Sequence, residues 1–129
     1  MIRLSNVKTQ AFRDGKWNEF NKFAILIAEG FYVNNRKQGV WREYYDHTGS
    51  LMIEQHYDNG IRHGRFASYH PNGQLFSEGA FNRGLREGYF RVYNEDGRNI
   101  RNLLFIHDNQ IEDIEVPQEI NEEQRREAT

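Results

Sequence analysis

Apolar and aromatic positions recur along the chain with a period of about 24 residues. Each period opens on a glycine, and these glycines are Gly15, Gly39, Gly64 and Gly88. A large aromatic stands two residues after each glycine, and another stands three residues further on. The two series are Trp17, Trp41, Phe66 and Phe90, then Phe20, Tyr44, Tyr69 and Tyr93. Such a fixed period is the sequence signature of a repeat architecture.

A second half of each period carries its own markers. Gly49, Gly73 and Gly97 indicate tight turns, because glycine accepts a positive φ. A glutamate column follows, and an aromatic stands three residues after each member: Glu29, Glu54 and Glu78, with Tyr32, Tyr57 and Phe81. Phe105 continues the aromatic column. The units are a half unit at 11–28, full units at 29–53, 54–77 and 78–101, and a closing half unit at 102–111.

Each unit predicts two strands joined by short turns. Short turns between adjacent strands indicate antiparallel neighbours, and the unit is too short for a crossover helix. The sequence therefore predicts an all-β protein, an elongated single-layer antiparallel meander of about nine strands. Trp41 and Tyr44 are three residues apart. Either they point to opposite faces, or a bulge or strand end rotates the second ring.

The pattern Gly-x-aromatic-x-x-aromatic, then Asn-Gly or Asp-Gly, then Glu-x-x-Tyr-x-Asn-Gly resembles the MORN repeat. The segments 72–75 and 57–60 are similar to the bacterial variant, whose members are often labelled antitoxin components. The resemblance covers 29–101 firmly and 11–28 and 102–111 loosely. It implies stacked hairpins that serve as scaffold, dimerisation or membrane-associated modules. Asn34-Asn35 departs from Asn-Gly, but asparagine tolerates a left-handed turn.

Composition adds two points. Aromatic residues make up 14% of the 129 residues, which suits a thin sheet covered by large rings. The formal net charge of −2 gives no indication of nucleic-acid binding. Residues 112–129 hold seven acids and two bases. We expect the repeat domain to span residues 1–111, and residues 112–129 to form an acidic tail that is disordered or a short helix after Pro117.

The aromatic columns are the first candidate binding surface. Their members on the predicted sheet face are Trp17, Trp41, Tyr44, Phe66, Tyr69, Phe90 and Tyr93. Stacked repeats bury a continuous apolar face, so one reading is a core. The other reading is a partly open groove for a peptide or helix, because a one-layer sheet has no second sheet to cover it.

A basic column is the second candidate surface. Arg13, Lys37, Arg62 and Arg86 stand two residues before the repeat glycines, and Arg36 lies beside them. Stacked turns would place these side chains along one edge of the sheet. The edge could contact acidic lipid headgroups or an acidic protein surface, or it could be a solvated turn region.

No pattern in the sequence predicts a reaction. We expect the glutamate column to pair across strands with Arg or Lys rather than to act in catalysis. The five histidines lack metal-ligand spacing, and the chain has no cysteine. We expect no enzyme activity, no metal and no cofactor.

The leading hypothesis is a non-catalytic protein-interaction module, with an antitoxin-like binder as its specific version. The alternatives are association with anionic membrane lipids through the basic edge, and a self-assembling structural protein or homodimer. The first six residues lack the apolar core of a signal peptide, and the longest apolar run, 23–28, is too short to span a bilayer. A cytoplasmic protein is expected.

Overall fold

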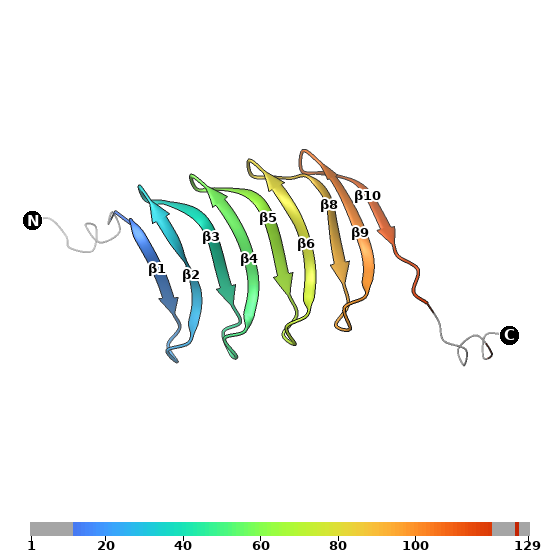
Figure 1. Ribbon diagram of the computed structural model, residues 1–129, viewed down its shortest axis with the longest axis horizontal. Coiled ribbons are helices and arrows are strands. Elements are labelled where there is room, and N and C mark those ends of the chain that lie inside the picture. The colour runs from blue at the N-terminus through green and yellow to red at the C-terminus, as the bar shows by residue number, and fades with distance from the viewer. Residues whose placement is uncertain (1–11, 120–125, 127–129) are drawn as a thin grey trace, which may run out of the picture.

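The computed structural model describes residues 12–119 and residue 126. One antiparallel sheet holds ten strands, and the strands follow one another in chain order across it (Figure 1). The strands are β1 (Gly15–Phe20), β2 (Leu26–Val33), β3 (Arg36–Tyr44), β4 (Leu51–Asp58), β5 (Ile61–Tyr69), β6 (Leu75–Asn82), β7 (Leu85–Arg86), β8 (Gly88–Tyr93), β9 (Asn99–Ile106) and β10 (Asn109–Glu115). The short β7 and β8 both pair with β6. Residues 12–119 contain no helix, so the predicted all-β single-layer meander is confirmed.

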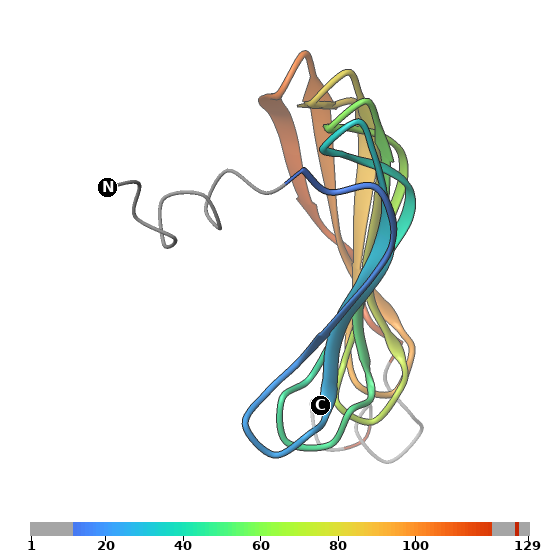
Figure 2. The same cartoon turned by 90° about the vertical axis from the view of Figure 1, so that its left-hand side faces the viewer.

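The sheet is one twisted layer when seen along its long axis (Figure 2). Its turns gather in two rows along opposite long sides (Figure 1). The row that joins β2 to β3, β4 to β5, β6 to β7 and β9 to β10 is called the upper turns. The other row, which joins β1 to β2, β3 to β4, β5 to β6 and β8 to β9, is called the lower turns.

The upper turns all use left-handed backbone at two adjacent residues. Asn34 and Asn35 have φ of 50° and 66°, which confirms that this Asn-Asn pair replaces Asn-Gly. The other three pairs are Asn59–Gly60, Arg83–Gly84 and His107–Asp108. Two positive φ values in succession characterise the type I′ hairpin turn, whose twist matches that of the flanking strands. The local sequence of each upper turn therefore favours a tight hairpin between the two strands that it joins.

The two aromatics of each unit lie on opposite faces of the sheet. Arg42 pairs with Glu54 across β3 and β4, so these two side chains share a face, and the neighbouring Trp41 takes the other. The hydroxyl of Tyr44 donates to Glu29, which lies opposite Arg42, and this places Tyr44 on the Arg42 face. A bulge next to Tyr44 adds one residue to β4. The rings of Trp41 and Tyr44 would lie on opposite faces without it, because the two residues are three apart in one strand.

The sheet extends further than the sequence analysis expected. β10 ends at Glu115, so residues 112–115, which were assigned to the acidic tail, belong to the last strand. Arg101 holds this segment in the sheet, because its guanidinium donates to both carboxylate oxygens of Asp113 at 2.6 and 2.5 Å. The backbone of Val116 then donates to Ile100. The helix expected beyond Pro117 falls mostly outside the described residues.

Candidate binding face

Eight aromatic rings form a ladder along one face of the sheet, which is called the ladder face. In spatial order they are Trp17, Tyr32, Trp41 and Tyr57, followed by Phe66, Phe81, Phe90 and Phe105, and ring contacts join the members within each group of four. Most neighbours meet edge to face, with centroids 5.0 Å apart for Tyr32 and Trp41 and 6.4 Å for Trp41 and Tyr57. This geometry suits the ring quadrupoles. Trp41 is 4% and Phe105 3% exposed, and Phe81 and Phe90 are buried as well, whereas the other four rings are half-buried.

Glycine makes room for the rings where they cross the neighbouring strand. A Cβ on Gly30 would overlap the Trp41 ring, and a Cβ on Gly79 would lie 2.6 Å from that of Phe90. Gln55 occupies the equivalent position in the second full unit, opposite Phe66. The side-chain oxygen of Gln55 is buried and has no hydrogen-bond partner among the described residues. The ladder is therefore interrupted near its middle by one polar group.

Four cations lie over the rings of the ladder. They are Arg13, Lys37, Arg62 and Arg86, called the ladder cations. Lys37 Nζ is 4.7 Å from the ring centre of Trp41 and 5.1 Å from that of Tyr57. Arg62 Cζ is 4.4 Å from the Phe81 centre. A cation above an aromatic face is attracted by the ring quadrupole, so the basic column and the aromatic column form one surface.

The ladder cations differ in their other partners. Arg86 Nε donates to Asp108 at 2.5 Å and holds the pKa of that carboxyl below its usual range. Arg13 donates to the Tyr32 hydroxyl at 3.4 Å. Within residues 12–119, neither Lys37 nor Arg62 forms an ion pair with a carboxylate. The two middle cations therefore have no direct carboxylate partner among the described residues, although the charge of Arg62 does act on Asp108.

The same four residues also tie the upper turns together through their backbone. The carbonyl of Lys37 accepts a hydrogen bond from the amide of Gly60 at 2.8 Å, and that of Arg62 accepts from Gly84 at 2.7 Å. Arg13 and Arg86 bond to Asn35 and Asp108 in the same way. These backbone hydrogen bonds fix the positions of the Cα atoms of the four cations. They also join each upper turn to the next, so the turns are stacked as predicted from the sequence.

The opposite face, called the polar face, carries alternating charges. Arg42 donates to Glu54 at 2.8 Å and lies 4.0 Å from Glu29, while Arg65 lies 4.0 Å from Glu54 and 3.4 Å from Glu78. The expected cross-strand pairing of the glutamate column is confirmed. These charges already satisfy one another.

Tyrosines extend the polar face toward the lower turns. Burial and a hydrogen bond to Glu29 raise the pKa of Tyr44 to about 12. The hydroxyl of Tyr93 donates to Glu78 at 2.8 Å, and burial followed by this bond raises its pKa as well. These phenols act as neutral donors to carboxylates at physiological pH.

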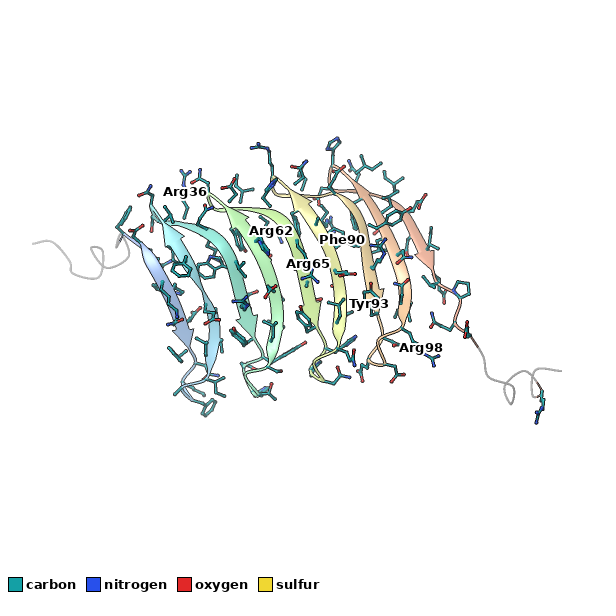
Figure 3. All side chains as sticks on the ribbon, in the orientation of Figure 1. Arg36, Arg62, Arg65, Phe90, Tyr93 and Arg98 are labelled. Carbon is teal, nitrogen blue, oxygen red and sulfur yellow. The ribbon has the colours of Figure 1, made fainter. Side chains whose placement is uncertain are left out.

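The candidate residues from the sequence divide between the two faces. Trp17, Trp41, Phe66 and Phe90 lie on the ladder face with the ladder cations, whereas Tyr44, Tyr69 and Tyr93 lie on the polar face. Arg36 pairs with Val33 and extends along Gly60 on the polar-face side. Figure 3 labels Arg62 and Phe90 of the ladder face and Arg65 and Tyr93 of the polar face.

Half of the ladder was missing from the candidate set. Tyr32, Tyr57, Phe81 and Phe105 alternate in space with the four aromatics that were chosen. The signal was available, because these residues form the column that follows the glutamates by three positions. A residue three positions after a polar-face glutamate lies on the other face of a regular strand.

Comparison with known proteins adds no assignment. No protein-family model and no curated protein matches the chain. Within the described residues, no helix has the length and apolar character needed to cross a membrane. The same residues bring no three His, Asp or Glu side chains together in a way that could hold a metal ion.

Proposed function

We propose that the protein is a non-catalytic module that binds a protein partner through the ladder face. The observation that carries this proposal is the row of four cations that lie over the aromatic ladder, on a sheet that has no second layer within residues 12–119. Aromatic and arginine side chains are enriched in protein interfaces because they combine large contact area with directed polar groups. The polar face is the weaker candidate, since its charges are already paired with one another.

The resemblance to the bacterial MORN variant supports the same class of function. It suggests a partner that is bound and neutralised, as an antitoxin binds a toxin. Any chemistry would then belong to the partner rather than to this chain.

Photo-cross-linking from the two faces of one strand tests this proposal. The chain has no cysteine, so a single cysteine can carry a benzophenone group. Ser77→Cys places it on the ladder face, because Ser77 pairs with Ser68, two residues beyond Phe66. Ala80→Cys places it on the polar face, opposite Arg65. We expect one protein in native extract to be cross-linked in high yield from Ser77→Cys and not from Ala80→Cys. Capture from Ala80→Cys alone, or no specific product, would contradict the proposal.

A second candidate is association with an anionic membrane through the upper turns. Each upper turn presents one aliphatic side chain that is 41–50% exposed, namely Val33, Ile61, Leu85 and Ile106. Arg36 pairs with Val33 across the strands, and Arg83 lines the same surface hollow as Ile61 and Asp58. Apolar side chains next to cations suit the interface of a bilayer that contains phosphatidylserine. Salt-sensitive vesicle binding that Ile61→Ser with Leu85→Ser abolishes would favour this function, and unchanged binding would exclude this surface.

A further inference from the structure

We propose that Lys37, Tyr57 and Arg62 form a seat for two acidic side chains of an extended polypeptide. This inference rests on the protein-binding function proposed above and names the chemistry of the partner. Lys37 lies on β3, Tyr57 on β4 and Arg62 on β5, in the middle of the ladder. The seat would accept carboxylates, and the half-buried rings of Tyr57 and Phe66 would contact the polypeptide between them.

The spacing of the two cations defines what fits between them. Their strands are separated by β4, so the backbones from which they start are about 10 Å apart. Acidic side chains three residues apart in a polyproline II helix lie about 9.3 Å apart on the same side of the chain. An extended segment with an acid at every third position therefore matches the seat. The segment would run along the sheet, across the strands.

The charge at the seat is available to a ligand. Neither Lys37 nor Arg62 has a carboxylate partner within residues 12–119, whereas Arg86 is bound by Asp108. Burial raises the pKa of Tyr57, the charge of Arg62 lowers it and that of Glu43 raises it. Like the hydrogen bonds of Arg86, the charge of Arg62 also lowers the pKa of Asp108. Neither Glu43 nor Asp108 forms an ion pair with Lys37 or Arg62. A carboxylate entering the seat would replace water on both cations, and charge-assisted hydrogen bonds are stronger than neutral ones.

The geometry of the seat is set before a ligand arrives. Lys37 is held over Trp41 and Tyr57, and Arg62 is held over Phe81. The hydroxyl of Tyr57 has no hydrogen-bond partner among the described residues, and Tyr57 pairs across the strands with Arg62. Holding flexible side chains in place lowers the entropy that binding has to remove. The phenol adds a third donor between the two cations.

A synthetic peptide provides a direct test. The probe is Ac-Glu-Pro-Pro-Glu-Pro-Pro-Glu-amide, added to the full chain at low ionic strength and followed by tryptophan fluorescence and calorimetry. Both tryptophans of the chain lie on the ladder face, so binding there changes their emission. We expect saturable binding that weakens with salt. The same peptide with glutamine in place of glutamate should not bind.

Matched variants separate the seat from net charge. Lys37→Met with Arg62→Met keeps apolar stems on the rings and should weaken binding at least about tenfold, the loss of a charged hydrogen bond. Arg36→Met with Arg83→Met removes two charges outside the ladder face and should change binding less than about twofold, as screened charges do. Tyr57→Phe retains the ring and should weaken binding by a factor of about 2–10, the value of one hydrogen bond. Circular dichroism confirms that each variant is folded.

Three results would overturn the seat. They are no saturable binding of the glutamate peptide to the wild-type chain, equal weakening in the two double variants, and binding of phosphatidylserine vesicles through Lys37 and Arg62 without binding of the peptide. If the Ser77→Cys cross-link still captures a partner, the proposed function stands and only the acidic seat fails. If the peptide binds as expected but no partner is captured, the seat is correct and the function proposed for it fails.

Discussion

Single residues decide how closely the ladder rings approach the sheet. Phe90 lies on the backbone of Gly79, and a Cβ at that position would come within 2.6 Å of the ring. Overpacking of a well-packed site usually costs about 1–3 kcal/mol. We therefore expect Gly79→Ala to lower the free energy of unfolding by about 1–3 kcal/mol in urea titrations.

Gln55→Ala is the matched control for that prediction, because Gln55 stands at the equivalent position. It removes a buried oxygen that has no hydrogen-bond partner among the described residues. Burying such an oxygen costs free energy, so its removal offsets the free energy of the packing that is lost. The expected change is below about 1 kcal/mol. Equal losses in Gly79→Ala and Gln55→Ala would show that the rings do not depend on glycine.

Arg83 holds a left-handed backbone that few residue types favour. Its φ is 48°, and Asn59 adopts 52° at the same position of the preceding upper turn. Left-handed backbone costs most L-residues about 1–2 kcal/mol, and asparagine tolerates it better. Arg83→Asn should therefore raise the free energy of unfolding by about 0.5–1 kcal/mol. The reverse change, Asn59→Arg, should lower it by a similar amount, and a loss of stability in both variants would contradict this explanation.

Among the elements, β10 differs from every earlier strand in its charge. Leu103 on β9 pairs with Phe90 on one side and with Asp113 on the other. The row of ladder residues therefore ends in a carboxylate on β10. Asp113 is bound by Arg101, and this contact lowers the pKa of its carboxyl. An inward-pointing charge on an edge strand discourages further strands from pairing with it.

The contact between Arg101 and Asp113 makes a pH-dependent contribution to stability. The pKa of Asp113 is lowered in the folded chain, so the contribution is complete above the unfolded pKa of about 3.9 and is lost as the pH falls through the folded value. Asp113→Asn should thus be less stable than the wild type at pH 6, and the difference should shrink toward pH 2. Urea titrations at several pH values measure it. A difference that is the same at all pH values would exclude this ion pair as its source.

Asp113→Phe tests whether the charge also blocks association at this end of the sheet. The change places an aromatic at the end of the ladder and removes the inward charge from an open edge. We expect this variant to form concentration-dependent dimers or larger species in sedimentation experiments, at concentrations where the wild type shows a lower mass. If the two chains sediment alike, the edge is protected by something other than Asp113.

At the scale of the whole molecule, repetition explains what could be predicted. The glycine and aromatic columns recur at each unit, so the hairpins, the turns and the single sheet followed from the sequence. The stacking of the basic column followed as well. Each of these features depends only on which residues occupy equivalent positions.

The contact between the basic column and the aromatic column could not be predicted in the same way. The basic column predicts the strand on which Arg62 lies and its position along that strand. It does not predict which neighbouring ring the flexible side chain covers, and in the structure that ring is Phe81. The end of the sheet was misplaced for a related reason. The strand β10 has a smaller bulge than β3 and β5, so its residues fall out of the repeat register, and the repeat pattern does not predict that residues 112–115 belong to a strand.

If the middle of the ladder face binds a dedicated protein partner, affinity purification of the tagged chain from native extract, in low and high salt, should retain that partner. Wild type is compared with Lys37→Met plus Arg62→Met, and retained proteins are quantified by mass spectrometry. We expect one protein in near-equal amount with the wild type and at least about tenfold less of it with the variant. The same protein retained equally by both chains, or only salt-sensitive background with the wild type, would contradict it.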